Sequence, residues 1–306
     1  VTTVYIVGTS LEMGTTESIV EVTVRLVIIF FGIIGNLFIM GVYLLKYRRS
    51  KALQPTELIV TILAFFNVLI PINLVLPMIR GYFLCNYFGE ASYKLVDVIV
   101  IFVSKASYWF LAWLCFFYCV QIIKVNWKLF LDLKRKISSV VKVLVFFTLL
   151  FCILMSIPVI SIIQIQRNSS QVLGHCKNFY MKGNNVFIYG VVLTALTSLL
   201  PLVIMVVSSL SIVIFLCKHS RNMTRNVSTG GSSHSNAHTA VAIMLICLII
   251  LFIVCTFTVI FANLQVSSGE FNILAAISIT SSLYSAGSAV ILVIGTVKLR
   301  KSFKKL

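Results

Sequence analysis

Six residues between positions 105 and 116 combine an ammonium group, aromatic rings and a small side chain at helical spacing. They recur every three or four residues and would therefore lie close together on a helix: Lys105, Tyr108, Trp109, Ala112, Trp113 and Phe116. A face with two indoles, a phenol and an ammonium could line an amphipathic pocket for small organic ligands. The alternative is that the rings belong to ordinary core packing or to an aromatic belt at the membrane interface.

Lys105 is the one cation deep within an apolar run of the sequence. A charge inside a membrane costs at least ~2.5 kcal/mol on insertion scales, so its side chain should face a cavity or a partner. Asp97, two turns earlier, is a candidate partner across a long gap. Alternatively, Lys105 extends its ammonium toward the outer headgroups. If it faces a pocket instead, acidic or hydrogen-bond-accepting ligands fit best.

The sequence shows no arrangement of residues suited to catalysis. Its four histidines lack the spacing of metal ligands: His175, His219, His234 and His238. No Ser-His-Asp set, phosphate loop or pair of carboxylates falls within a shared apolar run. We therefore expect neither an enzyme nor a cofactor or metal.

The elements that position these residues follow from composition. Of 306 residues, 59% are hydrophobic and 11% are charged, against about 45–50% and about 25% in soluble domains. Apolar runs of roughly 20 residues recur, each long enough to cross a membrane as a helix, and they lack the period of two that a β-barrel needs. The sequence predicts an all-α membrane protein, a single domain over residues 1–306. Its seven transmembrane helices lie at about 19–45, 56–79, 94–123, 139–164, 184–217, 238–263 and 271–296, before a short amphipathic tail helix at 297–306.

The charge of the chain indicates how these spans are oriented. The net charge is +17, from 25 Lys and Arg against 8 Asp and Glu. Eighteen of the 25 cations fall in the tail or in the loops after spans one, three and five, and only five fall in the opposite loops. The positive-inside rule then places the N-terminus outside and the C-terminus inside. A basic chain with so few charges between apolar runs indicates contact with membrane lipids rather than with nucleic acid.

Basic residues on the inner side alternate with apolar ones, which is typical of a segment lying on anionic lipid. In a seven-helix receptor the same surface would also face a G protein. The residues concerned are Lys124, Lys128, Lys134, Arg135 and Lys136, together with Lys218, His219 and His238.

Three residues of the outer loops carry separate expectations. Asn168 begins an Asn-Ser-Ser sequon, so glycosylation is possible there. Cys85 and Cys176 both face an oxidising compartment and could form a disulfide. Spacing alone does not show that their Cα atoms come within ~7 Å, so the pair could equally remain reduced.

Two asparagines stand in the middle of apolar spans. Asn36 and Asn67 could hydrogen-bond across spans one and two, which is ordinary contact between membrane helices worth about 0.5–2 kcal/mol. Because neither position holds a carboxylate, we expect no internal sodium site.

Several short sequence segments indicate a protein family as well as a membrane topology. They are Gly35-Asn36, Leu53-Gln54-Pro55-Thr56-Glu57-Leu58-Ile59, Phe117-Tyr118, Leu133-Lys134-Arg135-Lys136-Ile137, Pro201, Leu216-Cys217-Lys218-His219, Ala237-His238, Ile291-Leu292, Gly295, Lys298-Leu299 and Phe303. Together they resemble the bitter taste receptors, the type 2 taste receptor family of G-protein-coupled receptors, over nearly the whole chain.

The resemblance implies a multi-pass plasma-membrane receptor. Its partners would be a small organic, bitter agonist, an inhibitory or gustducin-like heterotrimeric G protein, and membrane lipids. Trp109 matches the span-three tryptophan of the family's bitterant pocket, and Ser278 matches a ligand-contacting position in span seven. Cys255 falls near the span-six switch position, and Tyr118 joins the two asparagines in the expected inter-helix set.

The chain also departs from the family pattern. Asn67 stands where the family usually has an arginine, Ser288-Ala289 replaces a His-Ser or His-Pro pair, and Ser285 replaces a proline. The usual polar lock between these helices is therefore not carried over. A vomeronasal type 1-like receptor is the alternative, and a transporter or channel is a third. The missing Asp-Arg-Tyr and Asn-Pro-x-x-Tyr motifs disfavour the rhodopsin-like main group.

Overall fold

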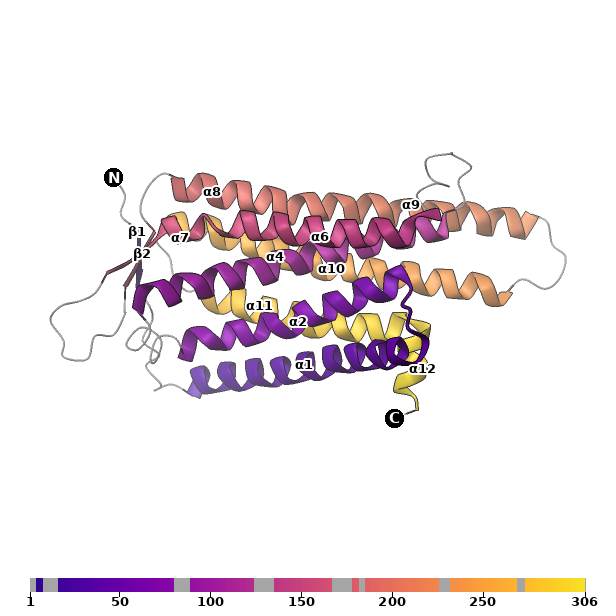
Figure 1. The fold of residues 1–306 in the computed structure, drawn as a ribbon, viewed down its shortest axis with the longest axis horizontal. Coiled ribbons are helices and arrows are strands. Elements are labelled where there is room, and N and C mark those ends of the chain that lie inside the picture. Colours follow the sequence, from indigo (N-terminus) through magenta and orange to yellow (C-terminus); the bar gives the residue numbers. More distant parts are fainter. Residues whose placement is uncertain are drawn as a thin grey trace.

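Long helices lie side by side in the computed structural model, which describes residues 4–7, 16–79, 89–123, 135–166, 178–181, 185–225, 232–268 and 273–305 (Figure 1). Long helices of the described part include α1 (Thr16–Ser50), α2 (Pro55–Ile79), α4 (Gly89–Ile122), α6 (Ile137–Ser156), α10 (Ser232–Ser268) and α11 (Ile273–Gly295).

Two of the expected spans are helices with an internal irregularity. The span-four helix continues past Pro158 as α7 (Val159–Ile162). The span-five helix consists of α8 (Asn185–Thr194), a π-helical turn η2 (Ala195–Leu199) and α9 (Leu200–Arg225). Pro201 follows that turn directly, and a proline lacks the N–H that would bond to the carbonyl four residues earlier. The widened turn is therefore found where the proline interrupts the helical ladder.

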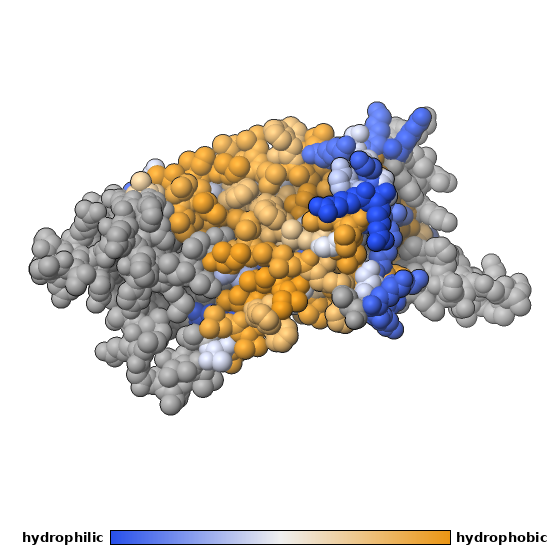
Figure 2. Space-filling view, turned by 60° about the horizontal axis from the view of Figure 1, so that its bottom comes forward, coloured by the Kyte–Doolittle hydropathy of each residue, from blue (hydrophilic) through white to orange (hydrophobic). Residues whose placement is uncertain are grey.

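Six helices of the described part are long and apolar enough to cross a membrane. The seventh span is formed by α11, which turns by 94° into the tail helix α12 (Val297–Phe303). On the face shown in Figure 2, apolar side chains cover the middle of the bundle, and blue, hydrophilic side chains gather beside them at one end. The expected fold class, a seven-helix membrane bundle with a short tail helix, is confirmed.

The sequence analysis did not predict the small sheet at the end of the bundle opposite α12 (Figure 1). Strands β1 (Val4–Val7), β3 (Asn178–Met181) and β2 (Ile163–Gln166) pair antiparallel in that order. Their β-branched and aromatic residues favour extended structure. The predicted span 139–164 therefore ends slightly early as a helix, at Ile162.

Helix α4 lies at the centre of the bundle. Of its membrane-spanning window 61% is buried, against 22–50% in the other five helices, and it packs on α2, α6 and α9. A helix that is covered on most sides contacts a different neighbour with each part of its circumference. The position of a residue around α4 therefore decides which helix it meets.

The connection from α1 to α2 places Glu57 at the end of the bundle that holds α12. Lys51 has a left-handed φ of 55°, and its N–H donates to the carbonyl of Tyr47 at 2.7 Å, which caps α1. Pro55 then opens α2, where its missing N–H has no cost. The backbone N–H of Gln54 donates to Glu57 Oε2 at 3.0 Å, so Glu57 caps the start of its own helix.

The packing of α10 on α11 leaves no room for a side chain at Gly295. A Cβ added at this glycine would lie 2.4 Å from Cγ and 2.5 Å from Cβ of Met244. The Met244 Cβ is attached directly to the α10 backbone, so it has little freedom to move away. By contrast, a Cβ at Gly41 of α1 would meet no atom within 4 Å.

We predict that Gly295→Ala destabilises the bundle by about 1–3 kcal/mol, the usual cost of overpacking. The measurement is thermal unfolding of the purified protein in detergent. Gly41→Ala is the matched control and should melt at or slightly above the wild-type temperature, because alanine favours the helix. Equal melting temperatures for the two variants would contradict the close approach of α10 and α11.

Candidate ligand-binding site

The six residues singled out on α4 are divided among several neighbouring helices rather than gathered on one common face. Tyr108 packs edge-on against Phe252 of α10 and Tyr284 of α11, with ring centroids 4.8 and 5.4 Å apart. Trp109 instead approaches Phe151 of α6 at 5.8 Å. Successive residues of a helix point about 100° apart, so adjacent rings on a central helix meet different partners. Ala112 is fully buried in the core.

The two tryptophans differ in how their N–H groups are satisfied. Their rings lie 5.5 Å apart, and Phe116 lies 6.0 Å from Trp113. Trp113 donates from Nε1 to Thr148 Oγ1 on α6 at 2.9 Å. The Nε1 of Trp109 is buried and has no hydrogen-bond partner within the described part of the chain. Trp113 is therefore fixed to α6 by a polar contact, whereas Trp109 has an unused donor.

Lys105 lies inside the bundle and does not extend toward solvent, because its side chain is only 8% exposed. Its Nζ donates to Ser198 Oγ in the π-helical turn at 3.1 Å and lies 5.4 Å from the ring centroid of Tyr108. Neither Asp97 nor any other carboxylate is among its contacts within the described residues. Lys105 therefore faces the interior of the bundle rather than the outer headgroups, and its hydrogen-bond partner is the hydroxyl of Ser198.

A buried polar network joins three helices beside this site. Asn67 of α2 donates from Nδ2 to Ser288 Oγ of α11 at 2.9 Å. Its Oδ1 accepts a hydrogen bond from Ser107 Oγ of α4 at 2.7 Å. Ser107 also contacts the hydroxyl of Tyr284 at 3.2 Å. The network connects the helix that carries Lys105 to α2 and α11.

The second asparagine joins the same network from α1. Asn36 Nδ2 donates to the carbonyl of Ser285 on α11 at 3.1 Å, and Ser285 Oγ donates to the backbone carbonyl of Asn67 at 2.6 Å. The sequence analysis expected hydrogen bonds across spans one and two, and this choice of partner helix is wrong. Both asparagines bond to α11, which packs against α1 and α2. Periodicity identifies polar positions but not the helix each one faces.

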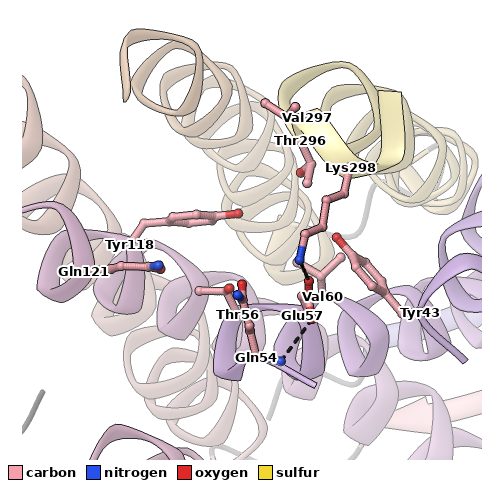
Figure 3. Close-up of a pocket in the computed structure, with 10 residues that line it drawn as sticks. All are labelled: Tyr43, Gln54, Thr56, Glu57, Val60, Tyr118, Gln121, Thr296, Val297 and Lys298. Atoms are coloured by element: carbon pink, nitrogen blue, oxygen red, sulfur yellow. Dashed lines mark hydrogen bonds and ion pairs between the residues drawn. The ribbon is translucent and has the colours of Figure 1, made fainter. Parts of the chain in front are cut away.

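Close to α12, Glu57 holds three helices together. It is 5% exposed, and its two oxygens bind Lys46 of α1 and Lys298 of α12, each at 2.5 Å. Glu57 and Lys298 border a cleft of about 160 Å³ that Tyr43 and Tyr118 also line. Figure 3 shows Lys298 pointing down from α12 onto Glu57, with Tyr118 on the other side of the cleft. The charge of Glu57 is neutralised at the point where the tail helix meets the bundle.

The remaining predicted residues fall into three groups. Cys255 is buried and contacts the carbonyl of Thr280 on α11 through Sγ at 3.7 Å. Arg135, Lys136 and Lys218 are exposed. Ser278 lies in α11, His219 in α9 and His238 in α10, but their side chains lie outside the described part. Also outside it are the residues Cys85, Lys124, Lys128, Lys134, Asn168 and Cys176.

A comparison of the chain with known protein families shows which family it belongs to. A family model described as taste receptor protein (TAS2R) matches residues 13–306. The chain belongs to the taste receptor type 2 family. This match favours the taste-receptor resemblance over the vomeronasal alternative and over a transporter or channel.

The sequences of several curated taste receptors align with most of this chain. Taste receptor type 2 member 39 of Homo sapiens is 24% identical over 287 residues, which are 90% of this chain and 82% of the relative. Member 4 of Rattus norvegicus is 24% identical over 279 residues, 90% of each chain. Member 40 of Gallus gallus is 26% identical over 201 residues, 64% of each chain. The protein is a multi-pass membrane receptor of this family at low sequence identity.

The departures from the family pattern contact one another in this taste receptor. The resemblance marks Asn67, Ser285 and Ser288 as departures from the family pattern, and the hydrogen bonds described above join all three. At these positions α2 and α11 are therefore connected through neutral groups. The sequence analysis expected no polar lock here, because periodicity does not show that the three residues lie together.

Sequence reasoning also missed partners that lie on other helices. Ser107, Thr148 and Ser198 are each hydrogen-bonded to a predicted residue. Nothing in the sequence singled them out, because hydroxyl side chains are common in membrane helices. Glu57 carried a usable signal. It is an acidic residue near the start of an apolar span, where an unpaired charge is costly, so a cationic partner was to be expected.

We predict that Asn67 and Ser288 are energetically coupled. In a double-mutant cycle, Asn67→Ala and Ser288→Ala should each lower the thermal stability of the receptor, with an interaction energy of about 0.6 kcal/mol and at most about 2 kcal/mol. Ser211→Ala is the control, because its hydroxyl bonds only to the carbonyl of Val207 in its own helix. Strict additivity of the two substitutions would show that the bond contributes nothing.

Proposed function

We propose that this taste receptor detects small, bitter organic molecules and signals through an inhibitory or gustducin-like heterotrimeric G protein at the plasma membrane. The observation that carries the proposal is the family match over residues 13–306, with Trp109 at the position of the family's pocket tryptophan. The aromatic and cationic side chains around that residue supply the amphipathic contacts that such ligands need.

The proposed orientation has the N-terminus outside and α12 inside. Its support is the distribution of charge, because exposed Lys and Arg side chains gather at the end of the bundle where α1 ends and α12 lies (Figure 2). Basic residues are retained on the cytoplasmic side of membranes. In this orientation the cleft around Glu57 and the basic surface face the G protein, and the sheet faces outward.

Activation follows from a shift between two arrangements of the helices. An agonist shifts this equilibrium only by binding one arrangement better than the other. The proposed ligand contacts come from α4, the central helix, which also carries Ser107 of the polar network and packs on α2, α6 and α9. Bound ligand therefore acts on the element with the most neighbours. Ser278 and the Cys255 contact between α10 and α11 complete the proposed set.

We predict that a panel of bitter compounds, tested in cells that express the receptor with a chimeric G protein, yields at least one agonist. Trp109→Ala should weaken the calcium response to that agonist by at least about tenfold, because it removes a large aromatic surface. Phe147→Ala is the control, since Phe147 is 59% exposed on the outer surface of α6.

An unchanged response of Trp109→Ala at equal surface expression would remove this residue from the proposed pocket. A silent panel combined with a response to pheromone-like volatiles would favour a vomeronasal type of function. Ligand-evoked current without any G protein would indicate a channel.

We further predict that the ion pairs of Glu57 support coupling to the G protein. Glu57→Gln should reduce the maximal calcium response more than Lys298→Ala, because Glu57 is buried and holds two lysines while Lys298 is half-exposed. The agonist concentration for half-maximal response should change little. Phe147→Ala, on the exposed outer surface of α6, serves as the control. An effect of Phe147→Ala as large as that of Glu57→Gln would overturn the role of this contact.

A further inference from the structure

Two neighbouring side chains on α4 have hydrogen-bond donors for which the described residues supply no acceptor. An ammonium has three donors, and Lys105 Nζ has a single acceptor among the described residues, the hydroxyl of Ser198 at 3.1 Å. The Nε1 of Trp109 has none. Both side chains are more than nine-tenths buried, at 8% and 9% exposure. Buried donors are normally satisfied, so this pair requires an explanation.

The neighbouring helix α6 is able to satisfy such a donor. One turn along α4, the indole N–H of Trp113 is bonded to Thr148 Oγ1 at 2.9 Å. Trp113 therefore has the contact expected of a tryptophan with a structural role. Trp109, packed against Phe151 of the same helix α6, lacks it. The unsatisfied donor is thus specific to the turn that also carries Lys105.

The spacing of the two donors suits one shared acceptor. Residues four apart lie on the same side of a helix, about 6 Å apart along its axis. The two side chains therefore leave the same side of α4, and a carboxylate can offer one of its two acceptor oxygens to each donor. The unsatisfied groups of Lys105 and Trp109 are both hydrogen-bond donors, so they favour a ligand group that accepts hydrogen bonds.

Charge narrows the choice of acceptor further. A buried cation without a counter-charge is expensive, and a hydroxyl partner does not compensate it. A carboxylate carries two acceptor oxygens and the missing negative charge, and its hydrogen bonds to an ammonium are about twice as strong as those between neutral groups. A neutral ligand would leave the charge of Lys105 unbalanced.

The surroundings describe the rest of the ligand. The Tyr108 ring lies 5.4 Å from Lys105 Nζ, and Trp109 packs near Trp113 and Phe151 at 5.5 and 5.8 Å. These rings favour an aromatic or otherwise apolar body. We propose that Lys105 and Trp109 bind the carboxylate of an amphipathic aromatic acid, an inference that rests on the proposed receptor function and names its ligand class.

The first experiment compares aromatic monocarboxylates with their own methyl esters on the full-length receptor. Each pair is tested for ligand-induced thermal stabilisation of purified receptor and for the cellular calcium response. We expect at least one acid to be active at a concentration at least about tenfold lower than its ester. If every active pair favours the ester, or if no acid either stabilises or activates the receptor, the proposal is wrong.

The second experiment assigns the preference to its residues. Lys105→Met should abolish the difference between acid and ester, whereas Lys105→Arg retains the charge and should keep most of it. Trp109→Phe keeps an aromatic ring but loses the N–H, so it should weaken acid binding several-fold. Lys142→Met, an exposed cation of α6, is the control. An unchanged ratio of acid to ester in Lys105→Met would overturn the assignment.

Thermal stability without ligand separates this role from a structural one. Lys105→Met removes a buried charge that lacks a counter-ion, so the empty receptor should melt at the same temperature or higher. If Lys105 served only to hold α4 to the π-helical turn, the variant would melt lower and keep its ligand preference. That combination would refute the proposal.

The two readouts also distinguish this inference from the proposed function. Stabilisation of purified receptor by an acid requires no G protein. Acids that bind through Lys105 without evoking any G-protein response would support the carboxylate site and contradict the receptor function. A calcium response to neutral bitter compounds alone, with no binding of acids, would support the receptor function and overturn the carboxylate site.

Discussion

A polar group inside the hydrocarbon region has no water to bond to, so it must find its partner within the protein. Most polar side chains in this bundle obey that constraint across helix boundaries. Asn67 is bonded to α4 and α11, Trp113 to α6, and Glu57 to α1 and α12. These bonds tie the helices together at defined points and so fix which neighbours each helix has. The buried Nε1 of Trp109 is one of a few exceptions among the described residues, and the hydroxyls of Ser209 and Thr256 are others.

The network around Asn67 shows that a polar contact can be preserved while its chemistry changes. Three residues that differ from the family pattern, Asn67, Ser285 and Ser288, bond to one another between α2 and α11. Each neutral bond between membrane helices contributes only about 0.6 kcal/mol on average, whereas bonds to a charged group are roughly twice as strong. The contact is therefore maintained by the number of its bonds. A single substitution in such a set also loses the fit to the other two residues.

Hydropathy and charge were sufficient to predict the seven spans and the tail helix, because membrane thickness and the loss of hydrogen bonds in lipid leave few alternatives. The partners of individual residues were not predictable in this way. Periodicity placed Lys105, Tyr108 and Trp109 near one another, yet it could not say that α4 is central and that these side chains meet α9, α10 and α6. The same limit applies to Asn36, whose bond reaches α11, 249 residues away in sequence. The π-helical turn that presents Ser198 depends on Pro201 and on the packing around it, so the proline alone did not locate it.

Three successive residues of α4 connect the proposed ligand site to the rest of the bundle. Ser107 bonds to Asn67 of α2 and contacts Tyr284 of α11, Tyr108 packs against Phe252 of α10 and the same Tyr284, and Trp109 packs against α6. These three side chains belong to one helical turn and point about 100° apart. A rotation of α4 at Trp109 therefore also changes the contacts of Ser107 and Tyr108. A ligand that binds Trp109 and Lys105 therefore acts on the turn that also positions α10 and α11. Tyr284 contacts both Ser107 and Tyr108, so in the proposed activation a movement of α4 would reach α11 at this residue, and through α11 the tail helix bound to Glu57.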